Sequence, residues 1–342
     1  MALTVEKAFL FPIMLIILAT CASHVFSRTL QESSFVEKHE QWMAEYGRTY
    51  QDEAEKQMRF NIFRQNLEYV EKANKEGNRT YKLSVNKFSD LTNEEFRAFY
   101  TGYKMPSNSR PSTTSFRYEN LTDVPPSKDW RQEGAVTGIK QQGSCGCCWA
   151  FSAVGALEGM IQINTGKLIP LSEQQLVDCS TNYGNHGCNG GFMDKAFQYI
   201  IENQGIATET DYPYQEMQGT CDAQKAAAAA ARISKFEELP ANDEQALLNA
   251  VSMHPVSVCI EGGGQDFQNY RSGVFNGQCG TQCDHAVTLI GYGTSEDGMK
   301  YWLIKNSWGE TWGENGYMRI QRDAGVSGGL CGIATGSSYP VA

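Results

Sequence analysis

Histidine is scarce in this sequence, with only five residues in 342. This scarcity limits the candidates for a general base in any acid–base reaction. His24 falls in an apolar N-terminal stretch, His39 in a helical pattern, His186 in a Gly-rich loop and His254 directly before a proline. Only His285 opens a run of alternating apolar residues, HAVTLIGYG, which predicts a buried strand. His285 is therefore the candidate base.

Long apolar runs are also missing after the N-terminus, where no segment reaches the roughly 18 residues that a membrane-spanning helix needs. Lys7 followed by AFLFPIMLIILAT predicts a secretory signal peptide over residues 1–27, with cleavage near Ala22 or Ser27. A retained signal anchor is the alternative. We expect no membrane association once the signal is removed.

Positive charge is not in excess anywhere. Residues 28–123 hold 15 basic and 15 acidic side chains, whereas residues 124–342 hold 13 basic and 23 acidic ones. The acidic balance of the longer part argues against nucleic acid as a partner.

Residues 28–123 contain no cysteine, and their patterns predict helices. Six positions advance by three or four residues and so share one helical face: Glu55, Arg59, Phe63, Asn66, Val70 and Asn74. A coiled-coil or surface helix is the alternative. Thr92 and Glu95 form a capping box that predicts a short helix through Tyr100. The following segment, rich in Pro, Ser and Thr, is typical of a linker.

A cluster of cysteines marks the candidate nucleophile in QQGSCGCCWAFS, residues 141–152. Apolar residues spaced by three or four from Phe151 to Ile161, with Gly166 as a stop, predict a buried helix that starts at Cys148. A thiol there faces unpaired backbone N–H groups and the positive end of the helix dipole, which favour thiolate. Asn306 in YWLIKNSWGETW offers an amide that can orient an imidazole.

These motifs resemble the papain-like cysteine proteases over nearly the whole chain. The resemblance is carried by QGSCGCCWAFS, GCNGG at Gly187 to Gly191, DHAV at Asp284 to Val287, and KNSWGETWGENGY from Lys305. His285 follows Cys148 by 137 residues, which fits the spacing of that family. Cys147 stands where the family usually has Ser or Ala, so two adjacent thiols compete for the role of nucleophile. The motif assigns it to Cys148, and the alternative is that both are ordinary buried cysteines.

The resemblance implies an α+β, two-lobe papain-like fold, with a helical left lobe and an antiparallel β-barrel-like right lobe. A helical inhibitory propeptide precedes it, similar to the I29-like propeptide of the cathepsin L-like branch, and the plant senescence-associated members are the most alike. The implied domains are the signal peptide 1–27, the propeptide with linker 28–123 and the peptidase domain 124–342. The peptidase lobes would divide near residue 235, and we interpret Ala226 to Ala231 as a surface crossover.

The resemblance also implies roles for single residues. Cys148 would be the nucleophile, His285 the base, Asn306 its orienting group and Gln142 an oxyanion donor, with Trp308 shielding the His–Asn contact. The substrate-binding residues would be Gly190, Gly191, Phe192, Met193, Cys259, Cys283, Ala286, Trp308 and Gly336, with Ser338 beside Gly336. Gly336 and Ser338 would form the far end of the pocket for the second residue before the scissile bond. No acidic residue is expected at that end of the pocket, which predicts an apolar or aromatic substrate side chain there.

Ten of the 11 cysteines follow residue 124, and such density behind a signal peptide indicates an oxidising compartment. The family pattern implies the pairs Cys145 with Cys188, Cys179 with Cys221, and Cys279 with Cys331. Cys259 and Cys283 either pair or remain free, and the free state is the favoured interpretation. A zinc site is the competing interpretation of the CGCC cluster, but the paired ligand spacing of structural zinc is missing. We expect no metal and no cofactor.

The sequence thus predicts a cysteine endopeptidase made as an inactive precursor and activated by propeptide removal at acidic pH. A peptide ligase using the same thiol, or a non-catalytic storage or binding relative, is the alternative. The expected partners are protein and peptide substrates, the chain's own propeptide and cystatin-like inhibitors, and we expect a monomer. Asn78 and Asn120 are candidate glycosylation sites. The expected destination is a vacuole, a lysosome or the extracellular space.

Overall fold

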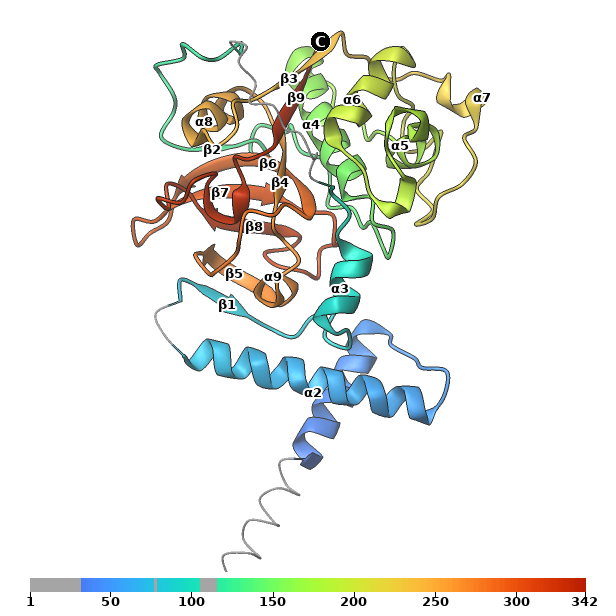
Figure 1. Cartoon of the computed structure of the whole chain (residues 1–342), viewed down its shortest axis with the longest axis vertical. Helices are drawn as coiled ribbons and strands as arrows, with labels where there is room; N and C mark the ends of the chain where they lie inside the picture. Colours follow the sequence, from blue (N-terminus) through green and yellow to red (C-terminus); the bar gives the residue numbers. More distant parts are fainter. Residues whose placement is uncertain (1–31, 77–78, 105–115) are drawn as a thin grey trace, which may run out of the picture. The chain divides into compact units, whose positions relative to one another are not determined.

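The computed structural model describes residues 32–76, 79–104 and 116–342 (Figure 1). The predicted signal peptide and Asn78 lie outside these residues. The chain divides into a first unit that ends at Glu68 and a second unit, Tyr69–Ala342. Nowhere in the described residues is there a helix with both the length and the apolar character needed to cross a bilayer.

The first unit contains a helix over residues 32–46 and the first part of α2 (Glu53–Lys75). The ring of His39 packs against Trp42, Phe60 and Phe63, which gives this unit an aromatic core. Helix α2 confirms the predicted periodicity. Phe63, Asn66 and Val70 of its stripe are buried, whereas both ends of the stripe, Glu55 and Asn74, are half-buried. Glu55 accepts a hydrogen bond from the Gln51 backbone at 2.7 Å.

The second unit begins with the rest of the predicted propeptide, which is not entirely helical. Strand β1 (Tyr81–Leu83) pairs antiparallel with β5 (Tyr270–Phe275), so the expectation of helices alone is wrong here. The side chain of Asn74 holds β1 by hydrogen bonds to both the C=O and the N–H of Leu83. Helix α3 (Asn93–Tyr100) follows with the predicted capping box and end.

Helices dominate the next part of the second unit. They are α4 (Cys148–Thr165), α5 (Glu173–Cys179), α6 (Met193–Glu202) and α7 (Ala223–Ala226), with 3₁₀ turns at Thr181–Tyr183 and Gly187–Asn189. The middle of the alanine run, residues 227–230, lies at the surface, as predicted, but its two ends are buried. Ala226 closes α7, and Ala231 accepts a hydrogen bond from the backbone N–H of Ile206; both alanines are buried. Small side chains suit this place because the run packs closely on a neighbouring segment.

All the described strands, including β1 and β5, belong to one sheet. Its order is β1-β5-β8-β7-β6-β4-β9-β3, and β2 pairs with β6. The other strands are β2 (Lys128–Asp129), β3 (Lys235–Glu238), β4 (Val256–Ile260), β6 (His285–Thr294), β7 (Lys300–Lys305), β8 (Tyr317–Gln321) and β9 (Ser337–Val341). One pairing, β5 with β8, is parallel, so this largely antiparallel sheet is mixed. The sequence patterns also did not predict α8 (Glu244–Met253) and α9 (Gln265–Gln268), or the 3₁₀ turn Leu330–Gly332.

Figure 1 shows α4, α5 and α6 to one side of strands β4 to β8. Hydrogen bonds at Ser152 attach helix α4 to the sheet: Ser152 Oγ donates to the Val287 carbonyl at 2.7 Å, and Ser257 Oγ and Thr288 Oγ1 donate to the Ser152 carbonyl at 2.8 and 3.2 Å. The approach is close, because a Cβ on Gly155 would lie 2.4 Å from Thr288 Oγ1. The start of α4 is therefore held at a fixed position against β6.

Four disulfide bonds join the described cysteines. Three are the implied pairs, Cys145–Cys188, Cys179–Cys221 and Cys279–Cys331. The fourth joins Cys259 to Cys283, so the favoured interpretation of two free thiols is wrong. The reason is strand pairing. The backbone N–H of Asp284 donates to the Ile260 carbonyl, and this contact brings Cys283, which precedes Asp284, beside Cys259 of β4.

Candidate active site

Cys148 is the first residue of α4, and its side chain is fully buried. The Cys145–Cys188 disulfide holds the preceding loop, together with a hydrogen bond of 3.0 Å from Gly146 N to Cys188 O. The Sγ of Cys148 accepts a hydrogen bond of 3.4 Å from the backbone N–H of Ala286. The thiol at the helix start therefore contacts the residue that follows His285, the first residue of β6.

The imidazole of His285 is held from two sides. Its Nε2 lies 2.8 Å from Oδ1 of Asn306, which directly follows β7. The indole of Trp308 stacks on it, with ring centroids 4.4 Å apart and planes inclined by 25°. Because an amide oxygen can only accept, the proton lies on Nε2 and Nδ1 keeps a lone pair. Nδ1 has no hydrogen-bond partner among the described residues, which leaves it able to take a proton.

Burial keeps both groups uncharged in this structure. It raises the pKa of Cys148 to about 12, although backbone N–H groups of Ala286, Trp149 and Tyr103 act in the opposite direction. Burial also lowers the pKa of His285 to about 4, against the effect of the Asn306 hydrogen bond. The thiolate expected from the helix position is therefore absent here, because desolvation outweighs the N–H groups.

Residues 100–104, which we call the covering segment, contribute to this burial, and the Tyr103 N–H acts directly on the Cys148 thiol. The backbone N–H groups of Gly102 and Tyr103 both donate to the Asp284 carbonyl, at 2.9 and 3.0 Å. On the opposite side, Gly191 N–H donates to the Gly102 carbonyl at 3.0 Å. The segment thus joins the loop before α6 to the start of β6, next to the Cys148 thiol.

Glycines make this approach possible. A Cβ on Gly102 would lie 2.0 Å from the Gly146 carbonyl oxygen, and one on Gly190, at φ +105°, would lie 2.5 Å from the Gly102 carbonyl oxygen. Gly190 and Gly191 therefore lie beside the covering segment, because glycine allows another backbone to approach closely. Their role in substrate binding stays a prediction.

The side chain of Tyr103 fills the predicted substrate pocket. Its ring meets Phe192 edge-on, with centroids 6.1 Å apart, and its hydroxyl would lie 3.2 Å from a Cβ on Gly336. The same cluster of buried apolar side chains contains Met193, Cys259, Cys283 and Ala286. Tyr103 thus packs against an apolar cluster built from distant parts of the sequence.

Two acidic side chains influence the hydroxyl group of Tyr103 in this pocket. Burial raises the pKa of the Tyr103 hydroxyl, and the negative charges of Asp194 and Glu238 raise it further. Glu238 stands opposite Ser338 in the β3–β9 pairing. Glu238 and Asp194 come from β3 and the start of α6, so the pocket residues implied by the resemblance did not include them.

Gln142 is fully buried beside the thiol loop. Its Nε2 donates to the Cys145 carbonyl at 3.0 Å and to the Tyr100 carbonyl of the covering segment at 3.4 Å. Ser307 Oγ donates to Gln142 Oε1 at 2.6 Å and so fixes which end of the amide points outward. Gln142 thus presents an N–H donor to a carbonyl oxygen of the bound segment.

The two adjacent thiols have different surroundings. Cys147 lies 2.9 Å from Tyr214 Oη, which donates to the Gln142 carbonyl at 2.7 Å. Burial raises the pKa of Cys147 well above its ordinary value. Among the described residues Cys147 makes its side-chain hydrogen bond with Tyr214, away from the imidazole, whereas Cys148 contacts Ala286, which directly follows His285. The geometry therefore favours Cys148 as the reactive thiol.

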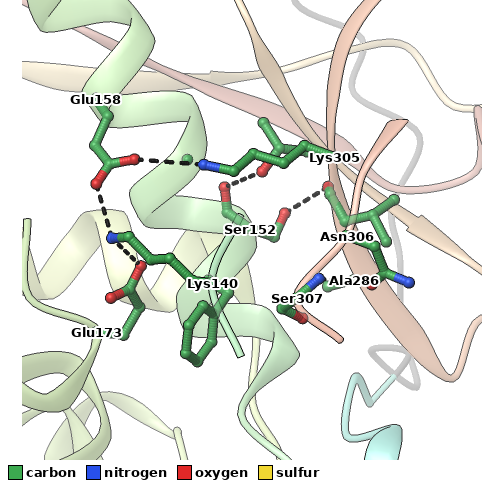
Figure 2. Close-up of a pocket in the computed structure, with 12 residues that line it drawn as sticks. Lys140, Ser152, Glu158, Glu173, Ala286, Lys305, Asn306 and Ser307 are labelled. Carbon is green, nitrogen blue, oxygen red and sulfur yellow. Dashed lines mark hydrogen bonds and ion pairs between the residues drawn. The ribbon is translucent and has the colours of Figure 1, made fainter. Parts of the chain in front are cut away.

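A buried group of four charges lies under the site (Figure 2). Lys140 Nζ bridges Glu158 at 2.8 Å and Glu173 at 2.7 Å, and Lys305 Nζ lies 3.9 Å from Glu158. Burial raises the pKa of Glu158, but the two lysines outweigh it and bring that pKa below its ordinary value. Because Lys305 directly precedes Asn306, this group joins α4 and α5 to the strand that carries the orienting amide.

Sequence reasoning did not find this charge group, although a signal was present. Glu158 is the one charged residue in the apolar run WAFSAVGALEGMIQI, and a buried carboxylate requires a cation. The fold determines which lysines pair with this carboxylate, because Lys305 lies 147 positions further along the chain than Glu158. Among the described residues, no group of three or more His, Cys, Asp or Glu could hold a metal ion.

This geometry agrees with the comparisons with known proteins. Residues 124–341 match the papain family cysteine protease model, and residues 39–96 match the cathepsin propeptide inhibitor domain (I29). The chain belongs to the papain family of cysteine proteases, and it is a cysteine endopeptidase precursor with its own inhibitory propeptide.

Among curated relatives, the senescence-specific cysteine protease SAG12 of Arabidopsis thaliana is 53% identical and covers 99% of each chain. Vignain of Ricinus communis is 53% identical over 84% of this chain and 81% of its own. Among solved structures, the proform of the ragweed pollen allergen Amb a 11 is 43% identical, with a TM-score of 0.85 over 91% of this chain and 95% of its own. The recombinant stem bromelain precursor is 45% identical, with a TM-score of 0.84 over 90% and 99%. The α+β papain-like fold with a propeptide is thus confirmed.

The close contact at Gly102 leads to a first prediction. Gly102→Ala forces the covering segment away from Gly146, at a cost of about 1–3 kcal/mol for overpacking. We expect the intact precursor at neutral pH to hydrolyse a peptide about tenfold faster than the unmodified precursor, because about 1.4 kcal/mol corresponds to tenfold. Gly138→Ala is the control, since a Cβ there has no neighbour within 4 Å. Equal initial rates for Gly102→Ala and the unmodified precursor would contradict the covering role.

The buried charge group leads to a second prediction. In a Cys148→Ala precursor, Glu158→Gln leaves Lys140 and Lys305 without their shared carboxylate, and we expect the free energy of unfolding to fall by about 3–5 kcal/mol. Urea denaturation measures this loss. The control is Glu133→Gln, which removes an exposed pair with Lys128 and should cost less than about 1 kcal/mol. Equal losses of unfolding free energy in Glu158→Gln and Glu133→Gln would show that the buried charge group stabilises the protein no more than an ordinary surface pair.

Proposed function

We propose that Cys148 is the catalytic nucleophile and His285 the general acid–base of this endopeptidase. The observation that carries the proposal is the aligned imidazole: Nε2 is fixed by Asn306, and Nδ1 is free to take the thiol proton. Once the covering segment leaves, water reaches the site and the cost of separating charge falls. His285 then takes the Cys148 proton, and thiolate and imidazolium form together.

The reaction follows from these positions. The thiolate adds to a peptide carbonyl, and the carbonyl electron pair moves to the oxygen. When the C–N bond breaks, the imidazolium gives its proton to the leaving amine, so the acyl group stays on sulfur. Water, losing a proton to His285, then attacks the thioester and releases the acid with restoration of the thiol. Asn306 keeps the ring aligned through both steps.

Oxyanion stabilisation is assigned to Gln142 and to the backbone N–H of Cys148. As the first residue of α4, Cys148 has an N–H without an intrahelical acceptor. The Gln142 amide already donates to a carbonyl of the covering segment, which supports this role. Such a donor lowers the activation free energy by about 3 kcal/mol or more.

Substrate preference is proposed from the occupant of the pocket. Tyr103 shows that an aromatic ring fits between Phe192 and Gly336. We therefore assign the site to apolar or aromatic side chains two residues before the scissile bond. Trp308, stacked on His285, shields the His–Asn contact from water.

The proposal includes propeptide removal and the compartment in which the mature enzyme acts. The mature enzyme begins near Val124, after removal of residues 28–123 at acidic pH, and acts as a monomer that cystatin-like inhibitors can bind. Four disulfide bonds support passage through an oxidising compartment toward a vacuole, a lysosome or the extracellular space. Asn120 is exposed and available for glycosylation. The names of the relatives suggest a role in senescing plant tissue.

Self-processing tests the catalytic assignment. The unmodified precursor, a Cys148→Ala variant and a Cys147→Ser variant are acidified, and both chain length and peptide hydrolysis are followed. We expect shortening to near Val124 with activity in the unmodified and Cys147→Ser proteins, and neither in Cys148→Ala. Activity that survives in Cys148→Ala but disappears in Cys147→Ser would move the nucleophile to Cys147.

A substrate series tests the preference. Peptides that differ only at the second residue before the cut carry Phe, Leu, Tyr or Arg, and kcat/KM is measured for each. We expect Phe, Leu and Tyr to exceed Arg, and Glu238→Gln to leave the Phe value unchanged. A higher value for Arg than for Phe in the unmodified enzyme would overturn the proposed preference and assign the acidic pair the deciding role.

A further inference from the structure

A second part of the predicted propeptide, residues 116–121, lies on the body of the second unit and contacts residues outside the catalytic group. Arg117 N–H donates to Glu237 Oε2 at 3.0 Å, and Asn249 Nδ2 donates to the Tyr118 carbonyl at 3.1 Å. Phe116 is buried within the main apolar core. These contacts come from β3 and α8, so the segment is docked by side chains as well as by its linkage to the chain.

His254 stands at the centre of this docking surface, directly after α8. Its ring packs between Tyr118 and Tyr339, with centroids 5.4 and 4.4 Å away. Nδ1 lies 3.0 Å from the Pro255 carbonyl and so carries the proton. Nε2 is buried and has no partner among the described residues. The site therefore fits a neutral imidazole, because protonation would bury a charge and an N–H donor without an acceptor.

We propose that the surface formed by Glu237, Asn249, His254 and Tyr339 is a second docking site for the propeptide, which holds residues 116–121 while His254 is neutral and releases them when His254 is protonated. This site is distinct from the covered thiol. It does not depend on the proposed catalytic roles.

The charges around His254 determine the sign of the effect. Burial lowers the pKa of His254 to about 4, the Pro255 carbonyl acts against this, Arg117 lowers the pKa further and Glu237 raises it. Burial raises the pKa of Glu237, but hydrogen bonds from Lys235, Tyr339 and Arg117 bring it down to about 2. The pKa values of Tyr118 and Tyr339 are raised above 10. Between pH 7 and pH 4, His254 is thus the group of this site that titrates.

Release follows from linkage. A histidine whose pKa is lowered in the docked state supports docking fully above its ordinary pKa, and this support weakens as pH falls toward the docked value. The pKa of His254 is about 4 when the segment is docked and returns to the ordinary value of about 6.5 when the segment is released. The docking equilibrium constant therefore falls about 20-fold between pH 7 and pH 5. Docking then stops weakening below about pH 4.

Amide hydrogen exchange in the full-length Cys148→Ala precursor tests this proposal without self-processing. The reporters are the N–H groups of Arg117, Glu119 and Leu121, which donate to Glu237 Oε2, Phe116 O and Tyr118 O. We expect their protection factors to fall about 20-fold from pH 7 to pH 5, and to change less than about threefold in His254→Gln, which cannot be protonated. Protection of the β4–β6 ladder confirms that each variant remains folded.

Two further variants make the result decisive. Tyr118→Ala removes the ring packed on His254 and should lower the protection of the reporters already at pH 7. His186→Gln removes an exposed imidazole and should behave like the Cys148→Ala parent. Protection that is equal at pH 7 and pH 5 in the parent, or that falls equally in His254→Gln, would overturn the proposal.

Discussion

Desolvation of one thiol and one imidazole is the interaction on which the inactive state depends. Cys148 stands where backbone N–H groups favour a thiolate, yet burial raises its pKa to about 12 and lowers that of His285 to about 4. The covering segment contributes to this with backbone hydrogen bonds to Asp284 and Gly191 and with the ring of Tyr103 in the substrate pocket. Inhibition and catalysis therefore use the same groups in two different environments.

The scaffold makes this environment reversible because the reactive groups do not depend on the propeptide for their positions. Helix α4 is attached to β6 through Ser152 and Val287, and the buried Glu158 pairs with lysines from two elements. Asn306 follows β7 directly. Removal of the covering segment can thus change solvation while the alignment of His285 is kept.

The propeptide in turn is held at several places in the second unit. Asp266 accepts hydrogen bonds from Tyr69 and Tyr81 and pairs with Arg79 at 2.9 Å. Residues 100–104 cover the thiol, and residues 116–121 dock beside His254. Separate anchors allow separate responses to pH, since each has its own titratable neighbours.

Much of this arrangement could be predicted from local sequence. The capping box of α3, the start of α4 at Cys148 and the strand opened by His285 follow from spacing over a few residues, and the His–Asn contact from motif resemblance. Features that depend on distant pairing could not be predicted. The Cys259–Cys283 bond and the parallel β5–β8 pair arise from strand pairing, which no local pattern encodes. The two acidic side chains that influence Tyr103 come from a strand and a helix that only the fold brings together. The neutral thiol was missed for a related reason, because its burial comes in part from a segment more than 40 residues away.

The protonation state of His285 in the intact precursor is the most direct test of this account. NMR of the isotope-labelled histidine ring, recorded at pH 6 to 8 before and after propeptide removal, distinguishes imidazole from imidazolium. We expect a neutral ring with the proton on Nε2 in the precursor and an imidazolium in the active enzyme. An imidazolium already present in the intact precursor would contradict inhibition by desolvation.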